Sequence, residues 1–204
     1  MTDAGIVFIV DDEEPVRDSI GLLLRSVGLR SQGFPDARAF LENCLPHQHG
    51  CLIVDVRMPR MSGLELQQEL NRRGWAIPLI FITGHGEVQM AVEAMRAGAV
   101  DFLQKPFKDD ELIRRVQKAL DHDQKHHEEL RSVEIIRSRY ETLTPREREV
   151  ATRLAAGQAN KIIAIDFDLS ERTVELHRAR VMQKLGIRGV AQLVQFLLKI
   201  NPTG

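Results

Sequence analysis

The chain contains few of the features that mark secreted, disulfide-bonded or membrane proteins. Its 204 residues include only two cysteines, too few for a disulfide framework or a cysteine-based zinc site. No apolar run approaches the roughly 18 residues that span a bilayer. The N-terminal apolar stretch has no basic residue before it and ends in four acidic ones, unlike a secretion signal. These absences predict a cytoplasmic protein with no membrane partner.

The chain as a whole also lacks a charge of one sign, because its formal net charge is −1. The two ends differ, however. Residues 1–120 contain 17 acidic and 14 basic residues, whereas residues 144–204 contain 6 acidic and 10 basic ones. The length allows two small domains. A basic second half predicts that only this part of the chain meets a polyanion.

Short apolar segments alternate with segments of helical periodicity in the first half. The predicted strands are residues 6–10, 29–34, 51–54, 77–83 and 99–104. The predicted helices are residues 14–28, 36–45, 62–74, 87–98 and 109–120. Alternating strands and helices favour a doubly wound parallel α/β sheet of the flavodoxin type, with strand order 2-1-3-4-5. Ligands of such sheets bind beyond the carboxyl ends of the strands.

Polar residues stand at several of these strand ends, namely Asp11, Asp12, Asp55, Thr83 and Lys105. Any one of them is ordinary at a strand end, but all five together predict a site. Clustered carboxylates favour a hard divalent cation such as Mg²⁺. One of them, Asp55, could then act as a nucleophile toward a phosphoryl group. The lysine and the threonine could pair with the oxygens of that group. The sequence leaves the isomer of the bond between Lys105 and the following proline open.

Three stretches of residues 5–120 carry a resemblance to a known family. They read "VDDEEPVR" at 10–17, "DVRMPRMSGLEL" at 55–66 and "FITGHGEVQMAVEAMRAGAVDFLQKPF" at 81–107. This region resembles the receiver domain of two-component response regulators. The resemblance implies that Asp55 is the phosphoacceptor. It also implies a Mg²⁺ site formed by Asp12, Asp55, the backbone carbonyl of Arg57 and, through water, Asp11.

The same resemblance assigns a switch. Thr83 and Lys105 correspond to the residues that sense the phosphoryl group, and Phe102 takes the position of a switch aromatic that is often tyrosine. The resemblance further implies that a surface near Val88, Val92, Met95 and Asp101 changes shape on phosphorylation and forms a homodimer.

The second half reads as helices only. "LTPREREVATRLAAG" has Thr144 as N-cap and Glu147 three residues later, a capping box. A helix to about residue 167, a short turn and a helix capped by Ser170 form a helix-turn-helix pattern. In the second of these helices Val174 and Val181 are expected to pack inward, while its basic residues face a polyanion. A structural bundle with a solvated charged face is the alternative.

"LTPREREV", "NKIIAI" and "LSERTVELHRARVMQKLGI" resemble the LuxR-type DNA-binding domain over residues 143–200. The whole chain resembles response regulators of the FixJ/NarL family, and the FixJ branch more closely. The resemblance implies that Glu175, Leu176 and Ala179 face base edges. It implies that phosphates are contacted by Lys161, Thr173, Arg178, Arg180 and Lys184.

The predicted organisation is a receiver domain (1–120), a helical linker (121–142) and a helix-turn-helix domain (143–204). Histidines 47, 49, 122, 126 and 127 could bind a metal, but no adjacent acid or cysteine is expected to complete a ligand set, so the sequence predicts that they form solvated surface.

The expected function is a transcription regulator phosphorylated by a sensor histidine kinase. Its other expected partners are double-stranded promoter DNA, a second copy of the chain and RNA polymerase. The only catalysis expected is slow Mg²⁺-dependent self-phosphorylation from small donors and slow autodephosphorylation. A phosphatase using Asp55 is the first alternative, but it needs a general acid, and Arg57 stands at the nearby position. A regulator that senses a small molecule is the second alternative, and it needs an apolar pocket instead of the acidic cluster.

Overall fold

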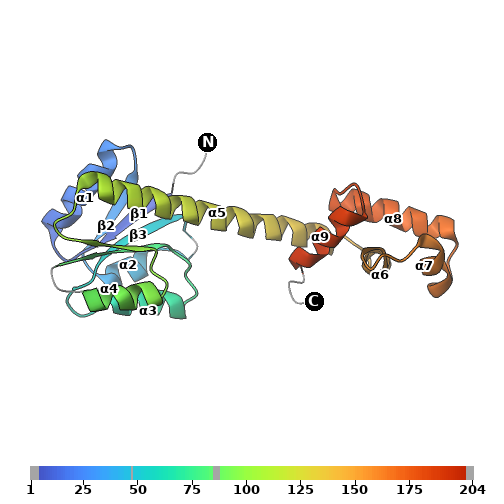
Figure 1. Ribbon diagram of the computed structural model, residues 1–204, viewed down its shortest axis with the longest axis horizontal. Helices are drawn as coiled ribbons and strands as arrows, with labels where there is room; N and C mark the ends of the chain where they lie inside the picture. The colour runs from blue at the N-terminus through green and yellow to red at the C-terminus, as the bar shows by residue number, and fades with distance from the viewer. Residues whose placement is uncertain (1–4, 47, 85–87, 201–204) are drawn as a thin grey trace. The chain divides into compact units, whose positions relative to one another are not determined.

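The computed structural model describes residues 5–46, 48–84 and 88–200, with the side chains of residues 88 and 89 excepted (Figure 1). The chain divides into two compact units, residues 1–127 and 128–204. Each unit has its own apolar core.

The first unit is built on a five-stranded parallel sheet. Its strands are β1 (Ile6–Val10), β2 (Arg30–Phe34), β3 (Gly50–Asp55), β4 (Leu79–Thr83) and β5 (Asp101–Gln104). The observed order, β2-β1-β3-β4-β5, confirms the predicted topology. Val10 pairs with Val54, Asp55 with Ile82, and Thr83 with Gln104. This register brings the carboxyl ends of β1, β3, β4 and β5 to one edge of the sheet. The predicted site residues lie at this edge.

Helices cover both faces of this sheet (Figure 1). They are α1 (Glu14–Ser26), α2 (Ala37–Asn43), α3 (Gly63–Arg72), α4 (Val88–Arg96) and α5 (Asp109–Glu141). On one face, α1 and the first turns of α5 pack against β1, β3 and β4 through residues such as Leu24 and Leu112. On the other face, α2, α3 and α4 contribute residues such as Phe40 and Leu66. Because both faces are covered, every residue of β3 is buried, which explains its continuous apolar run.

The last helix of the first unit, α5, is 33 residues long and continues into the second unit. Residues 121–141, most of the predicted linker, therefore lie within one helix. Its apolar residues have two different environments. Leu130 and Val133 are exposed, whereas Ile136 and Tyr140 pack against the core of the second unit.

The second unit is helical, with α6 (Pro145–Ala155), α7 (Asn160–Asp166), α8 (Glu171–Leu185) and α9 (Val190–Ile200). Both predicted caps are confirmed. Thr144 and Glu147 form the capping box of α6, and the Ser170 side chain accepts a hydrogen bond from the Thr173 backbone N–H at the start of α8. The inward stripe of α8 is also confirmed, because Val174 and Val181 are fully buried. None of the helices in the described residues is both long enough and apolar enough to cross a membrane.

Candidate functional site

Three of the predicted site residues contact one another at the carboxyl edge of the sheet. Lys105 Nζ donates to Asp55 Oδ1 at 2.8 Å and to Asp11 Oδ2 at 3.1 Å. The second carboxylate oxygen of Asp55 accepts the backbone N–H of Arg57 at 2.7 Å. Asp11 is 1% exposed and Asp55 is 9% exposed. Two nearly buried carboxylates thus share one ammonium group.

Burial raises the pKa of the Asp55 carboxyl, because ionisation is unfavourable where water is scarce. The Lys105 ammonium and the Arg57 N–H oppose this shift, and the Asp11 carboxyl adds to it. For Lys105 the balance is the reverse. Burial acts to lower its pKa, but the hydrogen bonds to Asp55 and Asp11 outweigh burial and raise it. The charged form of the lysine is therefore favoured, and two carboxyl groups share this one ammonium group.

The remaining receiver residues lie around this triad at different depths. Thr83, at the end of β4, is buried, and its Oγ1 donates to the Gly84 carbonyl at 3.4 Å. Asp12 and the side chain of Arg57 are exposed, next in the chain to the buried acids. Phe102 on β5 is partly buried and packs against the core on the α4 side of the sheet. The Lys105–Pro106 peptide bond is cis.

The backbone behind Asp55 is packed closely against the start of α3. A Cβ on Gly63 would lie 2.4 Å from the Asp55 carbonyl oxygen, so no larger residue fits without a shift of the backbone. The Gly63 N–H donates to the Val56 carbonyl at 3.0 Å. This contact fixes the chain on the C-terminal side of Asp55, and its signal in the sequence is the glycine of "MSGLEL".

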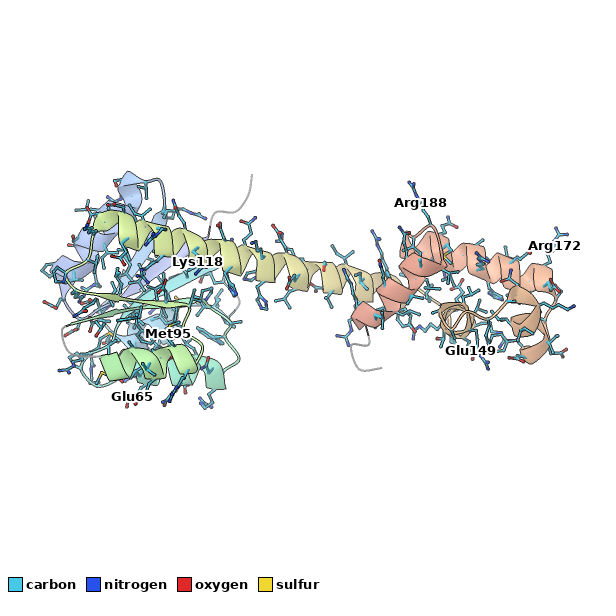
Figure 2. All side chains as sticks on the ribbon, in the orientation of Figure 1. Glu65, Met95, Lys118, Glu149, Arg172 and Arg188 are labelled. Atoms are coloured by element: carbon cyan, nitrogen blue, oxygen red, sulfur yellow. The ribbon has the colours of Figure 1, made fainter. Side chains whose placement is uncertain are left out.

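The candidate DNA-facing residues lie mainly on α8. Glu175, Leu176, Ala179 and Arg180 are exposed, and Leu176 retains 50% of its surface although it is apolar. The predicted phosphate contacts Thr173 and Arg178 are partly buried, and Lys161, on α7, is exposed. Arg172, at the start of α8, also projects from the helix (Figure 2). The exposed part of α8 thus combines basic residues with apolar and acidic ones.

Lys184 has a partner inside its own unit. Its Nζ donates to Glu147 Oε2 at 2.6 Å and to the Thr142 carbonyl at 3.0 Å. Glu147 is 3% exposed, so Lys184 neutralises a buried charge. Sequence reasoning assigned Glu147 to the capping box but missed this pairing, because the two residues are 37 positions apart. The predicted phosphate contact of Lys184 stays a prediction beside this structural role.

A second contact that sequence reasoning missed fixes the turn between α7 and α8. The Arg146 guanidinium lies 4.0 Å from the centre of the Phe167 ring and donates to the Phe167 carbonyl at 2.8 Å. Arg153 forms an ion pair of 3.3 Å with Asp166 on the last turn of α7. These α6 residues hold α7 against the rest of the unit, and thereby set where α8 begins.

The comparisons with known proteins agree with this geometry. Residues 7–117 match the response regulator receiver domain, and residues 141–197 match the bacterial regulatory proteins of the luxR family. The chain is 46% identical to the transcriptional regulatory protein FixJ of Rhizobium meliloti, over 97% of both chains. It is 46% identical to nodulation protein W of Bradyrhizobium diazoefficiens, over 94% of this chain and 84% of that protein.

Solved structures show the same likeness. The response regulator StyR has a TM-score of 0.89 at 40% identity, covering 96% of this chain and 99% of that one. Full-length FixJ from B. japonicum has a TM-score of 0.60 at 38% identity, with both chains fully covered. A parallel receiver sheet followed by a helix-turn-helix unit defines a DNA-binding response regulator. The chain belongs to the response regulators that carry a LuxR-type DNA-binding domain, and within them to the FixJ branch.

Proposed function

We propose that this transcription regulator acts in the cytoplasm and is switched by phosphorylation of Asp55, with a sensor histidine kinase as donor. The observation that supports this most is the contact of Lys105 with both Asp55 and Asp11. Asp55 is held at the end of a buried strand, where one ammonium group is ready to pair with an incoming phosphoryl oxygen. A surface aspartate with no such partner has no means of stabilising that group.

The residues present fit Mg²⁺. Asp11 and Asp55 place two carboxyl groups against the single ammonium group of Lys105, and their oxygens are the hard donors that this ion prefers. Asp12, Asp55 and the Arg57 carbonyl would hold the ion, with Asp11 acting through water. When bound, Mg²⁺ would neutralise charge between the carboxylate and the phosphoryl oxygens.

The proposed transfer forms a bond between an Asp55 carboxylate oxygen and phosphorus. The bond between phosphorus and the imidazole nitrogen of the kinase's phosphohistidine breaks, and its electron pair stays on that nitrogen. Lys105 then exchanges its contact with Asp55 for a phosphoryl oxygen. Slow transfer from small phosphodonors and slow hydrolysis of the acyl phosphate are the only catalysis that we assign to the chain.

Phosphorylation adds about 1.5 to 2 negative charges at the site. We assign the response to Thr83, whose hydroxyl is a donor for the phosphoryl group, and to Phe102, which shares the α4 side of the sheet. Val92 and Met95 on α4 are 45% and 44% exposed, so apolar surface is available there for a homodimer. Met95 is labelled on this helix in Figure 2. Of the predicted dimer surface, the side chain of Val88 lies outside the described residues. The change is a shift between existing states, so basal activity is expected.

The proposed output is binding of double-stranded promoter DNA through α8 and contact with RNA polymerase. A single unit of this size reads few base pairs, so a dimer on a repeated site is expected. Glu175 is suited to accept from a cytosine amino group, while the basic residues around it contact phosphates.

Intact mass spectrometry after incubation with a small phosphodonor and Mg²⁺ tests the acceptor. The full chain should gain one phosphoryl group, Asp55→Asn should gain none, and Asp18→Asn, altered at an exposed acid on α1, should behave as the unaltered chain. Phosphorylation of Asp55→Asn would contradict the assignment. Binding of promoter DNA, measured with and without the phosphodonor, then tests the switch.

A further inference from the structure

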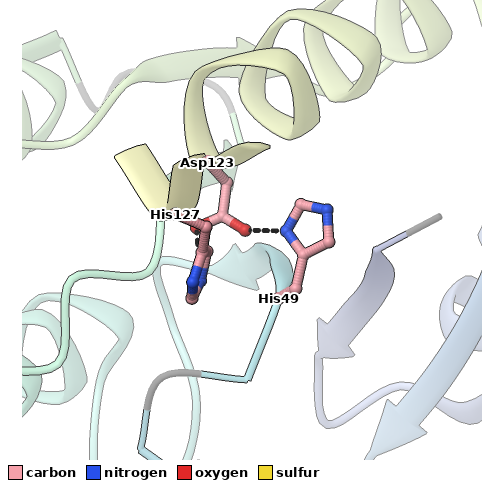
Figure 3. A group of neighbouring side chains, drawn as sticks. All are labelled: His49, Asp123 and His127. Carbon is pink, nitrogen blue, oxygen red and sulfur yellow. Dashed lines mark hydrogen bonds and ion pairs between the residues drawn. The ribbon is translucent and has the colours of Figure 1, made fainter. Parts of the chain in front are cut away.

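Two histidines and one aspartate from separate parts of the first unit meet beside α5. Asp123 and His127 stand one turn apart on α5, and His49 directly precedes β3 (Figure 3). His49 Nδ1 is hydrogen-bonded to Asp123 Oδ2, and His127 Nε2 lies 3.7 Å from Asp123 Oδ1. The expectation that no acid completes a ligand set with these histidines is wrong for His49 and His127. Asp123 is four residues before His127 on the same helix, whereas it is 74 residues away from His49, so only the fold brings all three together.

The carboxylate in this cluster is unusually well buried for a group on a helix that is otherwise polar. Asp123 is 1% exposed, and the Gly50 backbone N–H donates to its Oδ2 at 2.8 Å. A buried carboxylate is costly unless its oxygens have partners. The Gly50 N–H fixes the orientation of this one, and the two imidazoles lie at its oxygens.

We propose that His49, Asp123 and His127 bind a first-row divalent transition metal, Zn²⁺ in particular. Two imidazole nitrogens and one carboxylate oxygen are a donor set that Zn²⁺ takes with a water in the fourth position. The ligand atoms all lie within 4.8 Å of one another. Bond lengths near 2.0–2.1 Å in a tetrahedron place ligand atoms about 3.3 Å apart. Side-chain rotations that move these atoms by about an ångström would therefore bring them to the spacing that the ion needs.

The surroundings of the cluster suit an exchangeable ion. The side chains of His49 and His127 are 21% and 28% exposed, so solvent reaches them while the carboxylate stays covered. The Gly50 N–H would not bind the metal itself, but its hydrogen bond orients the carboxylate that does. This set also differs from the phosphoacceptor pocket, whose donors are oxygen atoms and favour Mg²⁺.

The ion would join the start of β3 to α5 at the residues where the first unit ends. His49 lies before the strand that ends in Asp55, and His127 is the last residue of the unit. Zinc binding would therefore protect the α5 turns around residues 119–127 from local unfolding, since anything that binds only the folded segment stabilises it.

Competition for Zn²⁺ with a chromophoric chelator, using the full chain, tests the site. We expect one tight Zn²⁺ per chain. His49→Gln and His127→Gln should each weaken binding by more than the roughly 10- to 100-fold that loss of an outer partner costs. The matched control is His122→Gln, altered at an exposed histidine of the same helix, and it should bind as the unaltered chain does. Glutamine keeps a hydrogen-bond donor for Asp123, so these variants are expected to fold.

A second readout places the ion. Co²⁺ should give the visible absorption of a tetrahedral complex in the unaltered chain and in His122→Gln, but not in the other two variants. Zn²⁺ should also slow amide hydrogen exchange in residues 119–127 of the unaltered chain. Absence of tight binding, or binding that His122→Gln abolishes and His127→Gln leaves intact, would overturn the proposal and leave the cluster a hydrogen-bonded tether between β3 and α5.

Discussion

Each unit of the chain contains a lysine that neutralises buried acid, and the two pairings have opposite electrostatic outcomes. In the first unit Lys105 serves two carboxylates, and the pKa of Asp55 is raised, chiefly by burial. In the second unit Lys184 serves one, Glu147. Burial there also acts to raise the pKa, but the contacts with Lys184 and with the Thr144 N–H lower it overall.

The difference follows from the count of partners. Glu147 has an ammonium group and a backbone N–H for its single charge, so its ionised form is well satisfied. Asp55 has comparable donors but shares its lysine with Asp11. A site with one acid too many is suited to accept a cation or to change its charge, whereas a balanced pair is suited to hold a fold together.

Removal of Lys105 should have the largest effect. Lys105→Met leaves two buried carboxylates facing each other, so we expect the free energy of unfolding at neutral pH to fall by about 3 kcal/mol, as when a buried ion pair loses one partner. Denaturant unfolding of the full chain measures this change. Lys108→Met, altered at an exposed lysine nearby, is the control, and equal stability of the two variants would show that Lys105 is not needed for charge balance.

Removal of the charge of Glu147 should have the next largest effect. Glu147→Gln leaves Lys184 without its carboxylate and weakens the α6 cap, at a cost of about 1–3 kcal/mol. Because the folded pKa lies below the usual 4.5, the stabilisation exists above pH 4.5 and is lost as the pH falls through the folded value. The difference in the free energy of unfolding between the unaltered chain and Glu147→Gln should therefore become smaller as the pH falls.

Denaturant unfolding as a function of pH measures this deficit. Glu149→Gln removes an exposed partner of Arg146 and should cost no more than about 1 kcal/mol. A deficit that is independent of pH would indicate that the glutamine shape, and not the lost charge, is responsible.

A basic residue of α8 that does not belong to the Lys184–Glu147 ion pair should affect DNA binding without affecting stability. Arg178→Ala should weaken promoter binding about tenfold, near 1.4 kcal/mol, and reduce the slope of log affinity against log salt concentration by about 0.9, as for one phosphate contact. Lys184→Ala should instead lower both affinity and stability, since Lys184 also neutralises Glu147. Salt titrations by fluorescence anisotropy measure the slope, and Arg188→Ala, at an exposed residue beyond α8 (Figure 2), is the control. An unchanged slope in Arg178→Ala would remove that residue from the interface.

The smallest effect is expected for Asp55→Asn on stability. The raised pKa means that the ionised carboxylate is disfavoured in the folded state. The contribution of the Asp55 carboxyl to the free energy of unfolding is therefore fully present below the ordinary pKa of 3.8 and is lost as the pH rises through the folded pKa. Asparagine carries no charge, so the variant should be slightly more stable than the unaltered chain at neutral pH and equal to it below pH 3.8. Thermal unfolding at the two pH values checks this, and a less stable variant at neutral pH would reverse the sign that we assign.

Most of the fold could be predicted from local pattern. Continuous apolar runs marked β1, β3 and β4, because strands covered on both faces need no alternation. The caps at Thr144 and Ser170 were visible because capping depends on residues three positions apart. The strand-end residues Asp11, Asp55, Thr83 and Lys105 were found because a parallel sheet brings the carboxyl ends of its strands together.

The sequence by itself determined the elements, the sheet order and the set of residues at its carboxyl edge, since these depend on short-range periodicity and on one rule of topology. Only the tertiary structure decided which charges meet. It placed Lys105 between Asp11 and Asp55, Lys184 on Glu147, and Asp123 between His49 and His127. Apart from the pair Asp123 and His127, these contacts join residues tens of positions apart. How far burial disfavours a charge depends on such partners, so it cannot be read from a local stretch of the chain.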